Sequence, residues 1–324
     1  MNHKQIIIFS EDKDTSTAGI MRWCKMDDIE VHRINSDDKK LKISISDNSV
    51  DISTSYDTFN IRKNSICWFR RAELPSVYIP PTQIENTMES EIAIFNFIER
   101  KQSFNSLKSW IKNNCKYSSD FINDAFNKVD VLMKAKQEGI AVPEWTVAEE
   151  KEKALQFAAK YEFVACKPFT SFFFQDKDIF YKNLTEKLTY AEISKFASYF
   201  IPRFFQQYIE KKYELRSFYF HGHFFTYAIL SQCNPKTIVD FRNYDEDKPN
   251  RCVPYNLPVT YSKKLEKLMN LLGLDTGSFD ILVDSKDDYY FLEVNPVGQF
   301  GYGSLMTNAN IEKYIADYLI NNLL

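Results

Sequence analysis

Apolar residues recur along this chain in short continuous runs and in helical spacings, which together predict an α/β protein. The opening "KQIIIFS" places four apolar residues side by side and predicts a buried strand. Two more short strands are predicted at 41–46 ("LKISIS") and 65–70 ("SICWFR"). Residues 82–112 have helical periodicity and contain neither Gly nor Pro, so a long helix is expected there. These elements predict a small α/β domain over residues 1–118.

A second helix is predicted by start and stop signals after residue 122. Asn123 or Asp124 is expected to cap it, Gly139 to end it, and Pro143 follows. Its apolar stripe consists of Val129, Leu132, Met133 and Ala135. Further on, the pattern predicts strands at 162–169 and 178–183, a helix at 189–200, successive strands over 203–230 with a His221-Gly222 turn, a helix at 262–275 and a last helix at 311–324.

The segment "GSFDILVDSKDDYYFLEVNP" predicts a hairpin of two antiparallel strands, 278–284 and 289–295, joined by a polar loop. Because successive side chains of a strand point to opposite faces, each strand has one wholly apolar side. That apolar side consists of Phe279, Ile281, Val283, Tyr290, Leu292 and Val294. We expect it to face the core, which leaves the other side free for function.

The opposite side of this hairpin gathers oxygen donors. If Asp284 pairs with Tyr289, Asp280 lies directly across from Glu293, with Cβ atoms about 4.5–5.5 Å apart. Asn295 comes two residues after Glu293 and shares its face. Two carboxylates this close repel each other unless a positive charge lies between them, and Mg²⁺ prefers oxygen ligands. The pattern predicts a metal site; the alternative is a solvated face with incidental acidic residues.

Composition is that of a soluble globular protein of two or three domains. The 324 residues are 44% hydrophobic and 26% charged, with a net charge of −3, so nucleic acid is not expected as the main partner. Six cysteines without a CxxC pair indicate reduced thiols, not a disulfide or zinc framework. The start lacks the long apolar region of a signal peptide or membrane span, so we expect a cytoplasmic protein with no membrane partner.

From Asn123 to the C-terminus, these motifs resemble the ATP-grasp carboxylate–amine ligases, such as D-alanine–D-alanine ligase and glutathione synthetase. Asp280, Glu293 and Asn295 resemble the metal-binding signature of that superfamily. The resemblance implies an α/β ATP-grasp fold with an N-terminal pre-ATP-grasp α/β domain, a central lid subdomain and a C-terminal mixed-sheet subdomain. The expected boundaries are 1–118, 119–205 and 206–324.

The same resemblance assigns roles to residues outside the hairpin. Lys128, before "GIAVP", and Lys167, in "FVACKPF", look like the two nucleotide lysines. In "FQQYIEKKYELRSF", the region of Gln207 would meet adenine, Glu214 the ribose, and Arg216 the phosphates or the acyl group. The implied set that binds ATP, with two Mg²⁺ ions, is Lys128, Lys167, Gln207, Tyr208, Ile209, Glu210 and Glu214. Many ATP-grasp enzymes have a glycine-rich loop after the second lysine, whereas "PFTSFFFQDKD" has no glycine.

Two arginines in the polar stretch 233–258 are further candidates. Arg242 and Arg251 suit stabilising an acyl phosphate or gripping an acidic peptide, because the guanidinium fork binds carboxylate and phosphate at two points. Together with Arg216 and Lys167, Arg242 makes up the expected catalytic set. The alternative is that these arginines order the loop through ion pairs with Asp240 or Asp245.

Four stretches resemble peptide-modifying ligases of the microviridin type and the "grasp-with-spasm" class. They are "WFRR" (68–71), "SQCNPKTIVDFRNYD" (231–245), "NRCVPYNLP" (250–258) and "FLEVNPVGQFG" (291–301). Such enzymes are graspetide maturases, which join side-chain carboxylates of a ribosomal precursor peptide to Ser/Thr hydroxyls or Lys amines. The implied partners are the leader and core of that peptide, a radical-SAM/SPASM companion and a second copy of the chain. Arg70 and Arg71 either bind acidic substrate or brace a domain interface.

Two other functions remain open at this stage. The first is a ligase of the same fold that adds free amino acids to a small molecule or a protein tail. The second is a non-catalytic nucleotide-binding protein, which the full set of lysines and metal ligands disfavours. No Ser/His/Asp or Cys/His nucleophile arrangement stands out, and His221 and His223 are expected at the surface.

Overall fold

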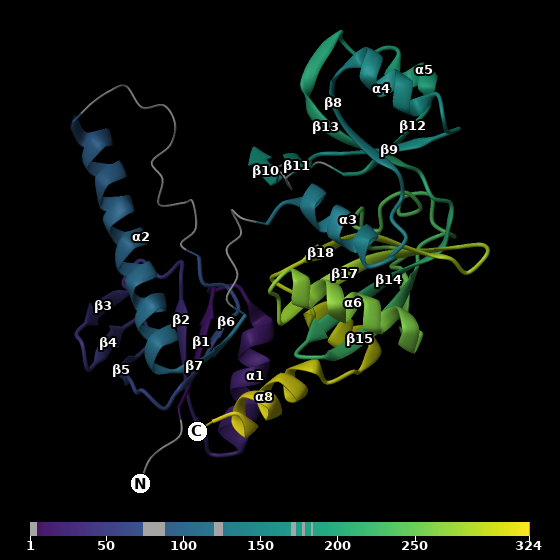
Figure 1. The fold of residues 1–324 in the computed structure, drawn as a ribbon. Helices are drawn as coiled ribbons and strands as arrows, with labels where there is room; N and C mark the ends of the chain where they lie inside the picture. Colours follow the sequence, from purple (N-terminus) through teal and green to yellow (C-terminus); the bar gives the residue numbers. More distant parts are fainter. Residues whose placement is uncertain are drawn as a thin grey trace. The chain divides into compact units, whose positions relative to one another are not determined.

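The computed structural model describes residues 5–73, 88–119, 126–169, 173–176, 179–182 and 184–323. The chain divides into two compact units (Figure 1). Unit 1 comprises Met1–Phe121, Phe300–Leu305 and Ala309–Leu324, and unit 2 comprises Ile122–Gln299 and Met306–Asn308. The expected three-part division at 118/119 and 205/206 stays a prediction, and the return of the C-terminal residues to unit 1 is not part of it.

A parallel sheet forms the centre of unit 1, in the order β2-β1-β6-β7. Its strands are β1 (Gln5–Ser10), β2 (Glu30–Asn35), β6 (Ile66–Phe69) and β7 (Lys116–Ser118). Every residue of β1 is buried, as the apolar run predicts for a parallel strand covered on both faces. A separate antiparallel sheet of β3 (Lys42–Ile45), β4 (Val50–Ser53) and β5 (Thr58–Ile61) completes the strands described for this unit. The predicted strands near 41–46 and 65–70 are confirmed.

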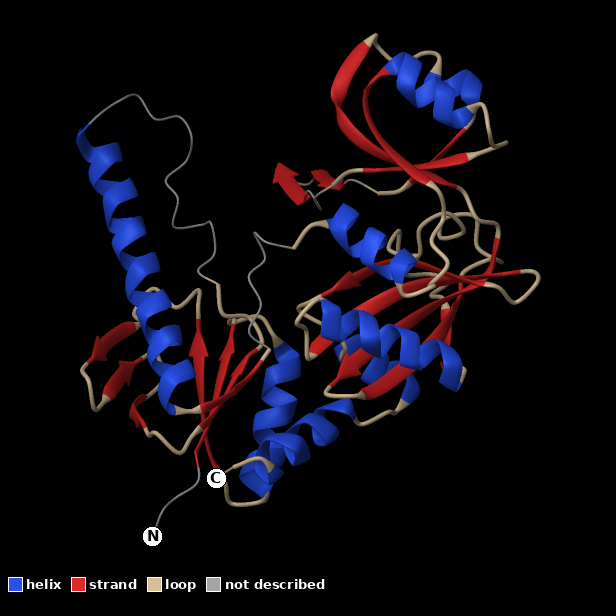
Figure 2. Cartoon of the chain, in the orientation of Figure 1, coloured by secondary structure: helices blue, strands red, loops and turns tan. Residues whose placement is uncertain are grey.

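Helices cover both faces of the parallel sheet (Figures 1 and 2). The predicted long helix is α2 (Met88–Asn114), whose second half packs Phe104, Leu107 and Ile111 into the core; residues 82–87 of that prediction lie outside the described residues. The other helices are α1 (Thr15–Met26) and α8 (Ile311–Asn321), which pack together. Helix α1 was not predicted from the sequence. None of the described helices is long and apolar enough to cross a bilayer.

Arg70 and Arg71 are held inside unit 1. The buried Arg70 pairs with Asp14 at 2.9 Å, and Arg71 pairs with Asp14 at 3.2 Å and with Glu11 at 3.1 Å. Asp14 is also the N-cap of α1, where its carboxylate accepts from the Ser16 amide. These ion pairs fix the start of α1 within the unit.

Unit 2 begins with α3 (Lys128–Gln137), which is capped by Asn127. The predicted cap at Asn123 or Asp124 is therefore wrong for this helix, and both residues lie outside the described residues. Its buried side chains are Val131, Leu132 and Ala135, whereas Met133 of the predicted stripe is 53% exposed. The helical period explains the change, because at about 100° per residue Val131, Leu132 and Ala135 fall on one face and Met133 lies on the opposite side. Gly139 ends the helix with φ +67°, as predicted.

An antiparallel sheet, the small sheet, follows in the order β12-β9-β13-β8. Its strands are β8 (Trp145–Glu150), β9 (Val164–Lys167), β12 (Glu186–Leu188) and β13 (Tyr199–Gln207). Helices α4 (Lys151–Ala158) and α5 (Tyr190–Ile193) lie on one face of it (Figure 2). The predicted helix at 189–200 is wrong: α5 ends after four residues, and the chain enters β13, which pairs with both β8 and β9.

Next to the small sheet, β10 (Phe173–Asp176) and β11 (Ile179–Lys182) form a two-stranded antiparallel ladder. It occupies part of the glycine-free stretch after Lys167. Residues 170–172 and 177–178 of that stretch lie outside the described residues. The predicted strand around 179–182 is confirmed.

The second sheet of unit 2, the large sheet, has the order β16-β15-β14-β17-β18. Its strands are β14 (Lys211–Phe220), β15 (His223–Leu230), β16 (Arg251–Tyr255), β17 (Thr276–Asp284) and β18 (Tyr289–Asn295). Every described pairing in it is antiparallel, so the expectation of a mixed sheet is wrong. α3 packs on β18 and contacts α6 (Val259–Leu271). The predicted turn lies at His221 and Gly222, both with positive φ, and His223 is exposed.

The β17–β18 hairpin has the predicted pairing at Asp280 and Glu293 and a different pairing nearer its loop. Asp280 pairs with Glu293, but Ile281 pairs with Phe291, so Leu292 is an extra residue in β18. The assumed pairing of Asp284 with Tyr289 is therefore wrong. This bulge turns Phe291 into the core, where the prediction put Leu292 and Tyr290.

Candidate active site

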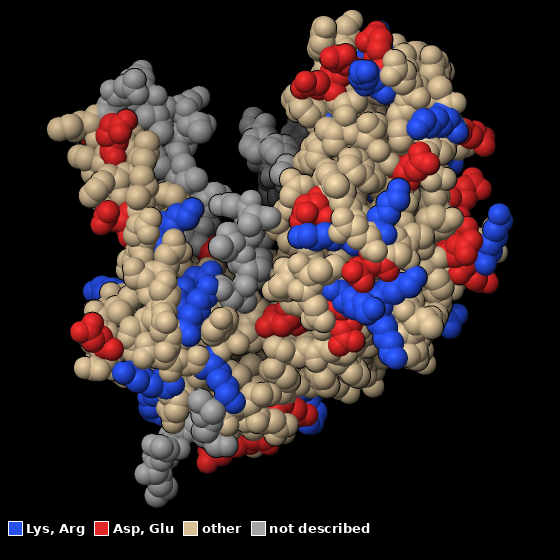
Figure 3. All heavy atoms as spheres, in the orientation of Figure 1, with Lys and Arg blue, Asp and Glu red and all other residues tan. Residues whose placement is uncertain are grey.

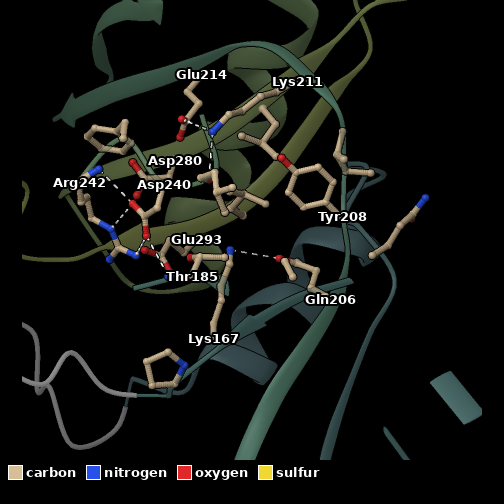
Figure 4. Close-up of a pocket in the computed structure, with 18 of the residues that line it drawn as sticks. Lys167, Thr185, Gln206, Tyr208, Lys211, Glu214, Asp240, Arg242, Asp280 and Glu293 are labelled. Carbon is tan, nitrogen blue, oxygen red and sulfur yellow. Dashed lines mark hydrogen bonds and ion pairs between the residues drawn. The ribbon is translucent and has the colours of Figure 1, made fainter. Parts of the chain in front are cut away.

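Unit 2 contains a cavity of about 110 Å³ lined by residues of both the small and the large sheet. Figure 4 shows side chains from β9, β13, β14, β17 and β18 converging on it. We call it the central pocket. The predicted residues that line it are Lys128, Lys167, Gln207, Tyr208, Ile209, Glu214, Arg242, Asp280 and Glu293. Segments more than 150 residues apart in sequence thus contribute to one cavity.

Two lysines bring positive charge to the central pocket. Lys128, the first residue of α3, donates from Nζ to Glu293 Oε2 at 2.7 Å. Lys167, at the end of β9, donates from Nζ to Gln206 Oε1 at 3.3 Å (Figure 4). Burial and the nearby Lys128 charge lower the pKa of Lys167 to about 8. An anion in the pocket would stabilise both ammonium groups.

The two opposed carboxylates have different surroundings. Asp280 accepts two hydrogen bonds from Arg216 Nη1, at 2.8 and 3.2 Å, yet burial raises its pKa, and the Glu293 charge adds to the rise. Burial also acts to raise the pKa of Glu293, but the positive charges of Lys128 and Lys167 outweigh burial, so the pKa of Glu293 is lowered. The pair therefore divides into one strongly ionised carboxylate and one that releases its proton less readily.

Asn295 lies at the end of β18, beside a second cavity of about 360 Å³ that Lys128 and Glu293 also line. Its Oδ1 accepts from the Val297 amide at 3.1 Å, and it does not line the central pocket. Among the described residues, no three His, Cys, Asp or Glu side chains gather as a metal site. A cation here would take oxygens from Asp280, Glu293 and Asn295 and needs further oxygens from a ligand. The donor chemistry fits Mg²⁺ with a phosphate-bearing partner.

Glu214 is buried at the back of the central pocket with Lys211. Its carboxylate pairs with Lys211 and accepts from Ser231 Oγ at 3.2 Å, while burial raises its pKa. Lys211 was not predicted as a pocket residue, because residues three apart in a regular strand face opposite ways. The β14–β17 register shifts between Lys211 and Tyr213, and this irregularity brings Lys211 and Glu214 together.

Apolar side chains form one part of the pocket wall, and we call this part the apolar slot. Its side chains are Ala165, Phe169, Ile209, Leu282 and Leu292. Tyr208 borders the slot, and the Lys187 ammonium lies 4.3 Å from its ring centroid. Glu210 of the predicted set is 84% exposed and does not line the pocket. Slots of this kind suit the flat face of a nucleobase.

Gln206 is a pocket residue that the sequence analysis missed. It is 1% exposed, and its Nε2 has no hydrogen-bond partner among the described residues. A buried amide that donates to nothing is costly unless a ligand or water accepts from it. The signal in the sequence is the pair Gln206-Gln207, because two adjacent strand residues cannot both face solvent.

The predicted arginines lie in three different settings. Arg242 lines the pocket and makes a two-point ion pair with Asp240, so part of the loop-ordering alternative is correct. Arg216 lies behind Asp280 and does not line the cavity. Arg251 is exposed on β16 and is not a pocket residue. Of these, Arg242 is the arginine placed to meet a ligand.

No protein-family model and no curated protein matches the chain, but solved structures do. A RiPP-associated ATP-grasp ligase of Chryseobacterium gregarium, in complex with ADP and a leader and core peptide, matches with a TM-score of 0.80 at 24% identity, covering 98% of this chain and 97% of that one. The macrocyclase MdnC of Microcystis aeruginosa MRC, bound to precursor peptide MdnA, gives 0.78 at 24% identity over 98% and 100%. This chain has the ATP-grasp fold.

A third ATP-grasp structure, the ligase PsnB with minimal precursor, Mg and ADP, matches with a TM-score of 0.68 at 14% identity, covering 98% of this chain and 97% of that one. The expected ATP-grasp fold class is thereby confirmed over nearly the whole chain. An ATP-grasp fold supports many reactions, so the chemistry has to come from the pocket itself.

Proposed function

We propose that this protein is an ATP-dependent peptide ligase that activates Asp or Glu side chains of a ribosomal precursor peptide and joins them to Ser, Thr or Lys side chains. One observation carries the proposal: two lysines and two opposed carboxylates line a single pocket beside an apolar slot. Phosphates and a cation balance these charges, and a base fills the slot. The similar ATP-grasp ligases solved with ADP and precursor peptides support this reading.

In this proposal the base of ATP lies against Ile209, Leu282 and Leu292, near Tyr208. The phosphates extend toward Lys128 and Lys167, whose point charges suit phosphate oxygens. Gln206 Nε2 supplies a buried donor, and Glu214 is the candidate for the ribose. The exposed Glu210 contributes its backbone at most.

Two Mg²⁺ ions are proposed for Asp280, Glu293 and Asn295. When bound, they supply positive charge to the phosphates and to the charge that develops during transfer. The protein prepares for them by keeping Glu293 ionised through Lys128 and Lys167, and by holding Asp280 against Arg216. When Mg²⁺ binds, Lys128 and Arg216 must move away from Glu293 and Asp280 or share these carboxylates with the metal ions.

The proposed reaction has two steps. A peptide carboxylate oxygen attacks the γ-phosphorus of ATP, which releases ADP and gives an acyl phosphate. A hydroxyl or amine of the same peptide then attacks the acyl carbon, loses its proton and displaces phosphate, so the peptide loses one water per linkage. Arg242 stabilises negative charge in these steps, Arg216 acts through Asp280, with which it pairs, and Lys167 orients the transferred phosphate. Closure of the small sheet over ATP would keep water from the acyl phosphate.

A homodimer is proposed on the basis of α2. Met88, Ile92 and Phe95, spaced at helical intervals, are 80%, 52% and 59% exposed. An apolar stripe of this kind is typical of a protein contact surface.

The proposal also places the enzyme in the cytoplasm, with a radical-SAM/SPASM companion of the grasp-with-spasm class. Among the described residues on the face drawn in Figure 3, Lys and Arg lie interspersed with Asp and Glu, so these residues form no broad positive surface there for nucleic acid.

The test is mass spectrometry of a precursor peptide encoded beside this gene, incubated with the protein, ATP and Mg²⁺. We expect a loss of about 18 Da, one water, for each linkage formed, together with ADP release that depends on the peptide. An unchanged peptide mass with continued ADP release on free amino acids would favour the small-molecule ligase instead. ATP binding without turnover of any acceptor would favour the non-catalytic protein.

A further inference from the structure

Asp240 lies in the loop between β15 and β16, and its side chain is 6% exposed. One of its oxygens, Oδ1, accepts from the Arg242 amide at 3.0 Å and from Arg242 Nε at 2.9 Å. The other oxygen, Oδ2, accepts from Arg242 Nη2 at 2.6 Å. This two-point pairing fixes the plane of the guanidinium.

The same carboxylate reaches across to the small sheet. Oδ2 also accepts from the Thr185 amide at 3.1 Å, directly before β12 begins at Glu186 (Figure 4). A carboxylate has about four acceptor positions, and all of those on Asp240 are used. One side chain therefore joins a loop of the large sheet, the pocket arginine and the edge of the small sheet.

The pairing leaves Arg242 Nη1 without a hydrogen bond to any residue that the structure describes. Hydrogen bonding to Asp240 raises the pKa of Arg242, and Glu293 and Asp280 act on it in the same direction. Without Asp240, the guanidinium would be drawn to those two carboxylates. Asp240 thus keeps Arg242 aimed into the pocket and away from the groups proposed to hold cations.

We propose that Asp240 is a positioning residue that orients Arg242 and makes this orientation depend on the docking of Thr185 and β12 against the large sheet. The inference rests on the proposed function for its effect on turnover. Docking of the small sheet over the pocket would then help to fix the Asp240 carboxylate and, through it, the position of Arg242 for the peptide carboxylate.

The main variant is Asp240→Asn, which keeps the size of the side chain but replaces one acceptor oxygen with a donor. Asn keeps one acceptor oxygen, so it can satisfy at most two of the four donors from Arg242 and Thr185, and its NH₂ group faces the other two. We therefore expect kcat for peptide-dependent ADP release to fall about 10- to 100-fold, with KM for ATP changed less than about threefold. Hydrogen exchange at the Thr185 amide should become faster. Glu186→Gln is the matched control, because it removes the neighbouring Arg203–Glu186 ion pair (3.2 Å), which lies outside the pocket.

A double-mutant cycle separates positioning from a general structural role. In an Arg242→Lys background, Asp240→Asn should change kcat less than about threefold, because the two-point pairing is already lost. Thr185→Pro removes the amide donor to Asp240, and it also fixes φ and replaces the Thr side chain. This variant should also lower kcat, which covers the case in which Asp240→Asn does not fold.

Three results would overturn the inference: unchanged kcat in Asp240→Asn, fully additive losses in the double variant, or unchanged exchange at Thr185. Failure of the proposed function has a different signature, since the wild-type protein would then show no peptide-dependent ADP release. The exchange measurement at Thr185 still tests the link to the small sheet in that case.

Discussion

Asp280 and Glu293 lie directly opposite each other on β17 and β18, and each forms an ion pair with a different basic side chain. Arg216 pairs with Asp280 and Lys128 with Glu293. The repulsion expected between the two carboxylates is therefore offset by protein groups from β14 and α3. This arrangement leaves the site folded before any ligand arrives and gives each carboxylate its own role.

The first prediction concerns Glu293→Gln, which removes the ionised member of this pair. We expect peptide-dependent ADP release to fall by about 100-fold or more, because a charge that acts on the phosphates and their cation is lost. Kinetics with saturating ATP and Mg²⁺ measure this, and circular dichroism checks folding. Asp287→Asn, which breaks only the exposed Lys212–Asp287 pair in the same hairpin, should keep full activity. Wild-type turnover in Glu293→Gln would remove Glu293 from the site.

The second prediction is that Asp280→Asn also impairs stability. It leaves the largely buried Arg216 without its carboxylate, and breaking such a pair costs about 3 kcal/mol of unfolding free energy. Glu293→Gln should cost less, because Lys128 can turn toward solvent and the repulsion on Asp280 is relieved. Urea unfolding of both variants compares the two losses. Equal losses would contradict the assigned pairing.

The third prediction concerns the pH dependence of ATP binding through Lys167. Its pKa is lowered to about 8, first by burial and then by Lys128, so the free protein loses this charge as the pH rises above that value. Bound phosphates favour the ammonium, so binding takes up a proton and the affinity for ATP should fall by up to about tenfold per pH unit above 8. Titration calorimetry in buffers of different ionisation enthalpy measures both effects.

The lowered pKa of Lys167 also makes the free energy of unfolding depend on pH. Between about pH 8 and 10.5 the unfolded chain holds more protons than the folded one, so this group raises stability with pH over that window. Lys167→Arg, which stays charged, should flatten the ATP profile, and Gln206→Glu should move its break to higher pH. A wild-type affinity that does not change from pH 7 to 9.5 would exclude Lys167 from phosphate binding.

The fourth prediction compares two glycines with positive φ. A Cβ at Gly298 would lie 2.7 Å from Phe218 Cε2 and 3.1 Å from Thr276 Oγ1, whereas a Cβ at Gly273 would meet nothing within 4 Å. Gly273→Ala should therefore cost only the backbone strain, about 1 kcal/mol. Gly298→Ala adds a clash and should cost about 2–4 kcal/mol. Thermal unfolding measures the difference, and equal costs would show that Phe218 gives way freely.

The acidic pair was predictable because alternation along two strands decides which side chains share a face. Asp280 and Glu293 keep that relation even though the assumed loop pairing is wrong, since the extra residue at Leu292 lies between the pair and the loop. Lys211 was not predictable for the opposite reason: an irregularity between it and Glu214 changes which face it occupies. Such irregularities leave no clear mark in the pattern of polar and apolar residues.

Helical propensity explains the error over 189–200. Thr189 and Glu192 form a capping box that starts a helix at Tyr190, as the sequence indicates. The helix ends at Ile193, and it cannot extend to residue 200 because the residues from Tyr199 onward belong to β13, which pairs with two other strands. Partners that are distant in sequence decide this outcome, and local signals do not contain them.

The packing of α8 on α1 has a consequence for how the protein forms during synthesis. Ile311, Ile315 and Leu319 are buried in unit 1, although nearly two hundred residues separate them from its N-terminal part, Met1–Phe121. While the ribosome is still translating unit 2, the first unit lacks this helix and exposes the apolar surface that α8 will cover. The N-terminal unit therefore completes its folding last, after residues 311–321 leave the exit tunnel.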